Sequence, residues 1–141
     1  MKTKIRIIDL VIALKHSCLV KEDSIREEFS LSPAEYRGII SINPGEAVKG
    51  NELSEKMGLS VSRGSRVIEK LTKKGYLKRT GNSSDRRCLT IALADKGLRV
   101  KNKIDRMLDQ CEREFESKIP KSEIKSFINS LDKLTAILQS N

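Results

Sequence analysis

The sequence is poor in the residues that build metal centres, disulfide frameworks and membrane spans. It holds one histidine and three cysteines among 141 residues, and the cysteines lie far apart, at positions 18, 88 and 111. With an odd number of cysteines and no Cys-X-X-Cys pair, we expect neither a bound metal nor a disulfide framework. No apolar run reaches the roughly 18 residues that cross a bilayer, so we expect no membrane partner.

Residue sets for catalysis are also lacking. The sequence contains no Ser/His/Asp set, no paired carboxylates and no phosphate-binding loop, so we expect no enzymatic activity and no cofactor. The first twenty residues, MKTKIRIIDLVIALKHSCLV, have the basic start and apolar run of a signal peptide. Asp9 and Lys15 interrupt that run and no small-residue cleavage site follows, so we predict a mature helix and a cytoplasmic protein.

Positive charge, in contrast, is concentrated in one stretch. Residues 60–93 hold nine Lys or Arg and two acids, whereas the remaining 107 residues hold 19 basic and 17 acidic side chains. Each cation placed near a DNA phosphate releases a condensed counterion, so a local excess of cations is typical of a DNA-binding surface. A solvated basic face on a helical protein is the alternative interpretation.

Helical spacing of apolar residues marks both ends of the chain. Segment 4–30 contains no glycine or proline, and its apolar residues recur at helical spacing, which predicts one long helix or a helix with a break near Lys21. Another long helix is expected after residue 97, with an interruption at Pro120 and a last helix starting at Ser122. These faces carry more apolar surface than the centre can cover. We therefore predict that 4–30 and 98–139 are dimerisation helices of a two-fold homodimer.

Two short helices are predicted early in the centre of the chain. Ser32 is expected to cap the first of them, and Glu35 can reach back to the Ser32 amide to complete a capping box. Val48, Leu53 and Met57 have the spacing of a second short helix.

The following helix is the one expected to read DNA. Ser60 is expected to cap its start, and Gly75 to end it. Gly64 has two interpretations, a close approach to DNA or a tolerated surface glycine. The residues expected to hold this helix against the core are Val61, Val67, Ile68 and Leu71.

Two strand-like segments, 76–79 and 88–93, follow that helix and are joined by a polar, basic loop. The expected fold class is therefore mainly α with a small β-hairpin wing. It is a winged helix-turn-helix with N- and C-terminal dimerisation helices, in a single chain 1–141 whose DNA-binding lobe spans 32–97.

The exposed side chains of the reading helix have the chemistry of base recognition. Arginine can bind guanine through two parallel hydrogen bonds, and serine can donate or accept at bases or phosphates. Lys74 is expected to contact the DNA backbone or the solvent, and Asp85 to orient the arginines of the wing. The residues expected to contact double-stranded DNA are Ser62, Arg63, Ser65, Arg66, Lys70, Lys73, Arg86 and Arg87.

The segment SVSRGSRVIEKLTKKGYLKR…SSDRRCLTIALADKG resembles the recognition helix, wing and following helix of the MarR family (multiple-antibiotic-resistance regulators). The resemblance implies a homodimeric winged-helix repressor or activator on a palindromic operator, modulated by a small-molecule effector or by cysteine oxidation. It implies an effector pocket near Tyr36. Ala94 stands where the family usually has a capping Thr, so Asp95 is expected to cap the long helix instead. Arg63 and Gly64 also depart from the family pattern, which leaves the operator sequence open.

The preferred prediction is a sequence-specific repressor that acts as a homodimer on a palindromic operator under the control of a small ligand. One alternative is a redox-responsive regulator that uses Cys18, although its place on an apolar stripe favours a packing residue. Another is a winged-helix module that docks acidic protein partners.

Overall fold

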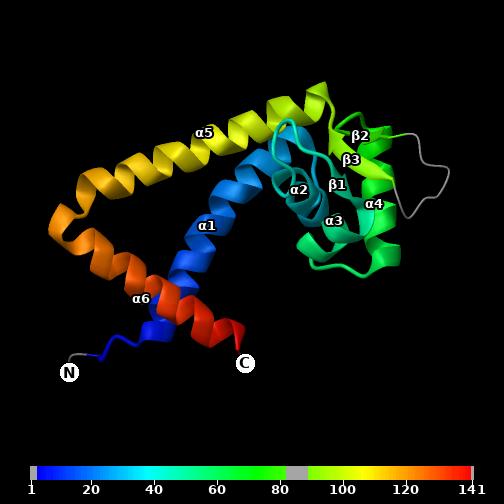
Figure 1. Ribbon diagram of the computed structural model, residues 1–141. Coiled ribbons are helices and arrows are strands. Elements are labelled where there is room, and N and C mark those ends of the chain that lie inside the picture. Colours follow the sequence, from blue (N-terminus) through cyan, green and yellow to red (C-terminus); the bar gives the residue numbers. More distant parts are fainter. Residues whose placement is uncertain (1–2, 82–88, 141) are drawn as a thin grey trace. The chain divides into compact units, whose positions relative to one another are not determined.

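The computed structural model describes residues 3–81 and 89–140 and falls into two compact units, Met1–Ile104 and Asp105–Asn141. Helices dominate both units, and the strands form one small sheet (Figure 1). The predicted fold class is therefore confirmed. In chain order, the elements are α1 (Ile7–Phe29), α2 (Pro33–Ile40), β1 (Val48–Lys49), α3 (Gly50–Lys56), α4 (Val61–Lys73), β2 (Leu77–Thr80), β3 (Thr90–Leu93), α5 (Asp95–Lys118) and α6 (Lys121–Gln139).

The sheet has three antiparallel strands in the order β1-β3-β2. The predicted hairpin forms its β2–β3 pair, in which Leu77 lies opposite Leu93. The prediction that Val48 belongs to a short helix is wrong, because Val48 pairs with Ile91 in the sheet. This partner lies far along the chain, so helical spacing around Val48 gives no sign of it.

Helices α2, α3 and α4 gather beside this sheet and enclose the core of the first unit (Figure 1). Leu53 of α3 and Leu71 of α4 are fully buried, as is Ile104 of α5. Full burial of each such side chain contributes about 1.5–3 kcal/mol relative to exposure in water. The core therefore holds α4 in place on the side opposite to its charged residues.

Local signals in the sequence set the helix ends as predicted. Ser32 and Glu35 form a capping box, in which the Glu35 amide donates to Ser32 Oγ (3.1 Å) and the Ser32 amide donates to Glu35 Oε1 (3.0 Å). Ser60 caps α4 by accepting a hydrogen bond from the Arg63 amide (3.3 Å). Gly75 follows α4 with a φ of +84°, a left-handed conformation that favours glycine.

Helix α5 begins at Asp95, whereas a helix capped by Asp95 would begin at Lys96. The Ala94 carbonyl already accepts the first helical hydrogen bond, from the Leu98 amide (2.8 Å), and the helix starts at Asp95. The expectation that Asp95 caps the helix is therefore wrong. Its carboxylate instead lies in the first turn, where the positive end of the helix dipole favours a negative charge.

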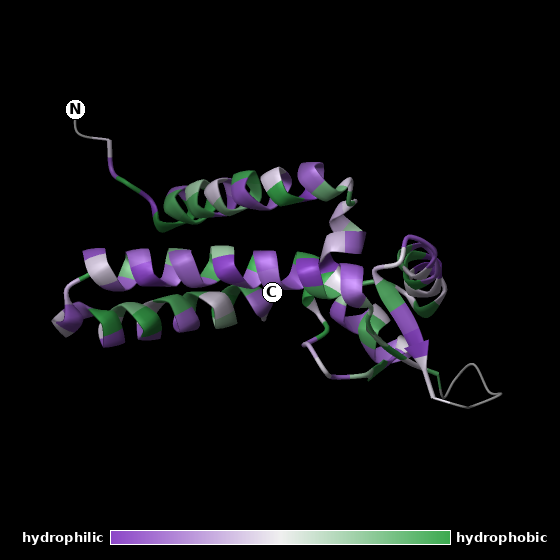
Figure 2. Cartoon of the chain, turned by 90° about the horizontal axis from the view of Figure 1, so that it is seen from above, coloured by the Kyte–Doolittle hydropathy of each residue, from purple (hydrophilic) through white to green (hydrophobic). Residues whose placement is uncertain are grey.

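Helix α1 leaves most of its apolar side chains exposed. Ile25, near its C-terminal end, is its only buried residue. In Figure 2, hydrophobic residues (green) recur along this helix, which starts near the N label. The exposed large apolar side chains on α1 are Ile7, Ile8, Leu10, Ile12, Leu14, Leu19 and Val20.

The second unit contains the later part of α5 and all of α6. Pro120 lies between the two helices, as predicted, and α6 begins at Lys121, one residue before the predicted start. Among the described residues of α6, none is buried. The exposed large apolar side chains of this unit are Leu108, Phe115, Phe127, Ile128, Leu131, Ile137 and Leu138.

Candidate DNA interface

Helix α4 has a buried face and a charged outer face. Gly64, Ile68 and Leu71 are its buried residues. Residues three to four positions apart share a helix face, so Ser62, Arg66 and Lys73 line the side opposite this buried face. The helix is thus fixed by one side and presents polar and cationic groups on the other.

Gly64 is a packing residue between α3 and α4. A Cβ atom at this position would lie 1.9 Å from Ser54 Oγ and 3.0 Å from Ser54 Cα. Ser54 is itself buried, and its hydroxyl donates to the Gly50 carbonyl (2.9 Å). Both interpretations of Gly64 from the sequence are therefore wrong, because it faces α3 rather than DNA or solvent. Glycine here lets the two helices of the helix-turn-helix approach closely.

Val61 was expected in the core but lies on the surface, with 63% of its area exposed. It is the first residue of α4, one position after the capping Ser60. The apolar character of Val61 therefore led to the wrong prediction that its side chain is buried.

The predicted reading residues are all exposed, but they do not share one face. Ser62 and Arg66 point outward with Lys73, whereas helical spacing places Arg63 and Lys70 together on one flank. Ser65 lies on the other flank, and its side chain lines a cavity of about 250 Å³. The structure therefore divides the predicted set into an outward group and two flanking groups.

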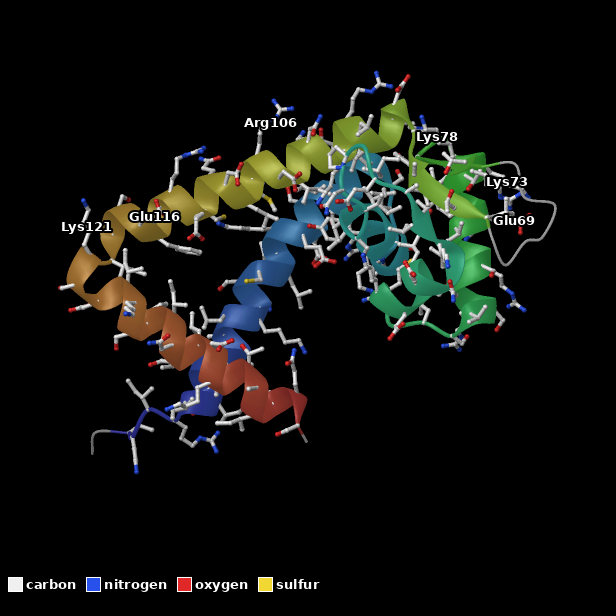
Figure 3. All side chains as sticks on the ribbon, in the orientation of Figure 1. Glu69, Lys73, Lys78, Arg106, Glu116 and Lys121 are labelled. Atoms are coloured by element: carbon white, nitrogen blue, oxygen red, sulfur yellow. The ribbon has the colours of Figure 1, made fainter. Side chains whose placement is uncertain are left out.

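The cavity beside Ser65 lies between α4 and the β-hairpin. Its charged lining groups are Glu69 of α4 and Arg79 of β2, and its apolar lining includes Ile68, Leu89 and Ile91. Glu69 also pairs with Lys73 at 3.6 Å, and both side chains lie together on α4 (Figure 3). Each is more than half exposed, so this pair contributes little to stability.

Lys74, expected to face DNA or solvent, is tied to the interior of the first unit. Its ammonium donates to the buried carboxylate of Glu35 at 2.7 Å. The carbonyl of Lys74 accepts from Lys96 Nζ (3.3 Å), which also lies 4.6 Å from the centre of the Tyr76 ring. The pair with Glu35, which the sequence did not predict, leaves 40% of the Lys74 side chain exposed. The partner of Lys74 lies 39 residues away, and no local signal identifies it.

The Glu35 carboxylate has the electrostatics of a structural ion pair. Its burial by itself would raise the pKa, but hydrogen bonds from Lys74 and from the backbone and side chain of Ser32 outweigh burial and lower it. Tyr36, beside it on α2, is buried, and burial together with the nearby Glu22 raises its pKa against the opposing effect of Arg26. The charged form of Glu35 therefore joins the start of α2 to the end of α4.

The wing is described only at its base. The Thr80 and Thr90 hydroxyls lie 2.5 Å apart across the hairpin, and Lys78 and Arg79 are exposed on β2. The predicted wing residues lie outside the described residues, which end at Gly81 and resume at Leu89. These are Asp85, Arg86 and Arg87.

The described cysteines differ in exposure and do not lie in a metal-binding cluster. Cys18 is exposed on α1 in the single chain, and Cys111 is half-buried on α5. Within residues 3–81 and 89–140, no group of three or more His, Cys, Asp or Glu side chains has a metal-binding arrangement. In the same ranges, none of the helices combines the length and apolar character needed to cross a bilayer.

Comparison with known proteins places this geometry in a family. Residues 31–89 match the model of the MarR family. A curated relative, the HTH-type transcriptional regulator SarZ of Staphylococcus saprophyticus, is 29% identical over 114 residues, which cover 77% of this chain and 78% of that protein. The transcriptional repressor MprA of Escherichia coli is 31% identical over 64 residues, which cover 44% of this chain and 36% of that protein.

Solved structures share the fold over nearly the whole chain. The structure of Streptococcus pneumoniae FabT in complex with DNA superposes with a TM-score of 0.84 at 21% identity and covers 96% of both chains. Apo MarR from Escherichia coli superposes with a TM-score of 0.64 at 16% identity and covers 94% of this chain and 98% of that one.

Residues 31–89, which contain the helix-turn-helix, are thus similar to the MarR family. The resemblance drawn from the reading helix, wing and following helix is thereby confirmed. So is the expectation of a transcriptional regulator rather than an enzyme.

Proposed function

We propose that this protein is a sequence-specific DNA-binding regulator that places α4 in the major groove. The observation that carries the proposal is the exposed N-terminal half of α4, held by a buried opposite face. Side chains near the start of such a helix reach base edges. The residues assigned to base reading are Ser62, Arg63, Ser65 and Arg66.

Cations further along the lobe supply contacts to the DNA backbone. Lys70 and Lys73 are exposed on the later turns of α4, where phosphates lie closer than base edges in this docking geometry. Arg86 and Arg87 would contact the minor groove or its phosphates from the wing, with Asp85 as their orienting partner. Lys74 is excluded from this set because Glu35 neutralises it.

The exposed apolar faces support a homodimer. Side chains such as Ile12 of α1 and Ile128 of α6 are more than half exposed in the single chain. Exposed apolar area on this scale marks a protein interface. We propose that segments 4–30 and 98–139 cover these faces in a two-fold dimer. Two α4 helices would then read the half-sites of a palindromic operator, about one DNA turn apart.

The mode of regulation is the part of the proposal that rests on the family. MprA is named a transcriptional repressor, and we propose that this protein also represses transcription. A small-molecule effector would act by changing the distance between the two α4 helices, since both must fit the operator at once. Exposure of Cys18 is compatible with the redox alternative. A regulator of this kind would act in the cytoplasm, where the DNA is.

Selection of bound sequences from a random DNA pool, with the mass of the protein measured in solution, tests the central proposal. We expect an enriched palindrome and a dimer mass. A different result would support a docking module for acidic partners instead. In that case the protein would be a monomer, would enrich no DNA sequence and would release its bound DNA when acidic proteins are added.

Substitution of Arg66 separates base reading from phosphate contact. Arg66→Ala should weaken binding to the selected sequence by about 10-fold or more, because a bidentate contact with guanine discriminates by roughly 1–3 kcal/mol. Binding to random DNA should weaken less. Arg113→Ala, which removes an exposed arginine from α5, is the matched control. Equal losses on both DNAs would identify Arg66 as a phosphate contact.

A further inference from the structure

Val61 is an apolar residue in an otherwise polar surface. Among the described residues from Leu31 to Ile104, it is the only large apolar side chain that is exposed. The other exposed large apolar residues described lie on α1, α5 and α6, or at Ile5 just before α1. Those belong to the faces assigned to the dimer, whereas Val61 lies apart from them on α4.

Val61 continues the stripe of Gly64, Ile68 and Leu71 to the first residue of α4, but there its side chain is mostly exposed. Ser60 already caps α4, and the buried contacts of the helix come from Gly64, Ile68 and Leu71. Valine is a weaker helix former than alanine because its branched Cβ restricts the side chain. With 63% of its surface exposed, Val61 also gains little from burial.

The neighbours of Val61 are the groups assigned to base reading. Ser62 follows it directly, and Ser65 lies one turn along on the same flank. Arg63 and Arg66 make this end of the helix cationic, which disfavours an apolar protein partner. A helix that enters the major groove by this end brings the exposed Val61 methyl groups into the groove on the flank of Ser65.

Only one apolar group is presented by the bases in the major groove, the C5 methyl of thymine. We propose that Val61 is a specificity-determining residue that contacts the C5 methyl group of a thymine in each half-site. The inference rests on the proposed function, because it requires α4 to lie in the major groove. It adds a preference for thymine that the polar reading residues do not supply.

Deoxyuridine provides a direct probe, because uracil lacks only the C5 methyl group of thymine. The operator is taken as the sequence that the wild-type protein enriches from a random DNA pool. Each thymine of one half-site is replaced in turn by deoxyuridine. We expect one replacement to weaken wild-type binding by about fourfold, the effect of losing one buried methyl group. The other replacements should leave affinity unchanged.

Two variants separate contact from structure. Val61→Ala should bind the thymine and the deoxyuridine operators equally, because the partner of the methyl group is gone. Val61→Thr keeps the branched shape and one methyl group, and should retain part of the difference. Val67→Ala makes the same truncation at a half-buried position of α4 and should keep the full thymine preference. Unfolding of Val61→Ala in urea should match the wild type, since the side chain is exposed.

The outcomes distinguish this inference from the proposed function. An enriched operator whose thymines all tolerate deoxyuridine would overturn the role of Val61 and leave the regulator intact. A thymine preference that persists in both Val61 variants would overturn it as well. If the wild type enriches no sequence, the proposed function fails, and the inference fails with it. A preference that Val61→Ala removes and Val67→Ala keeps supports the assignment.

Discussion

Similar apolar residues are buried in the DNA-binding lobe around α4 but exposed on the long helix α6. Leu53 and Leu71 are fully buried within the lobe, whereas Ile128 and Leu138 on α6 are about half exposed. The lobe has helices on several sides and a sheet to enclose its core, but α6 has no buried residue among those described. The difference indicates that the lobe completes its own core, whereas the apolar residues of α6 stay uncovered in the single chain.

The two regions also differ in what their surfaces offer. The lobe exposes polar and cationic side chains on α4, with Val61 as the exception, while α1 and α6 expose stripes of apolar residues. Cationic surface suits phosphates, and apolar surface suits another protein. Four substitutions test this division, in order of expected effect.

The largest effect is expected from Gly64→Ala, which tests whether close packing of α3 on α4 holds the lobe. The added Cβ would overlap Ser54, so we expect a loss of about 3 kcal/mol in the free energy of unfolding, measured in urea. Gly50→Ala is the matched control, since nothing lies within 4 Å of its added Cβ. Equal stability of the two variants would contradict close packing. Ser54→Gly should partly rescue Gly64→Ala.

Ile128→Glu tests the apolar face of α6. If this face is covered in a dimer, the loss of its burial should weaken the dimer by about 2 kcal/mol or more, roughly 30-fold in the dissociation constant. Analytical ultracentrifugation measures the change. Ser130→Glu places the same charge on a polar residue of the same helix and should have little effect. An unchanged dissociation constant for Ile128→Glu would remove α6 from the interface at this position.

Acid tests the internal ion pair between Glu35 and Lys74. The fold lowers the Glu35 pKa below its ordinary value of 4.5, so the charged form stabilises the folded state above that pH. This stabilisation should be lost as pH falls through the lower folded pKa. We expect wild type to lose more stability than Glu35→Gln between pH 5 and pH 3 in urea titrations. Glu69→Gln, which removes an exposed carboxylate, should lose as much stability in acid as wild type does. If Glu35→Gln also loses as much, the Glu35–Lys74 pair does not cause the acid sensitivity.

The smallest effect on stability is expected from Lys73→Ala, since Lys73 is 77% exposed and its ion pair within the described residues is with the exposed Glu69. The free energy of unfolding should change by less than about 0.5 kcal/mol. Binding to the selected DNA should weaken, and the slope of log affinity against log salt should decrease by about one. An unchanged slope would show that Lys73 contacts no phosphate.

The helix ends of the lobe were predictable because their causes are local. Ser60 caps α4 through the amide of a residue three positions later, and Gly75 ends it through its own φ. The Ser32–Glu35 capping box is equally local. By contrast, the strand at Val48 was missed because its pairing partner, Ile91, lies on a distant strand.

The candidate site was predictable in composition but only partly in arrangement. Ser62, Arg63, Ser65 and Arg66 are exposed, as polar residues usually are. Their division into an outward group and two flanks depends on which face of α4 packs inward. Lys74 resembles its exposed neighbour Lys73 in sequence, yet it binds Glu35.

The sequence by itself determined the β-hairpin, both ends of α4, the concentration of positive charge and the resemblance to the MarR family. These depend on neighbouring residues or on counts, which the chain carries before it folds. Only the tertiary structure decided that Gly64 is an inward packing residue and that Val61 is exposed beside the reading residues. Whether a side chain is buried depends on which distant segments cover it, and those contacts exist only in the folded molecule.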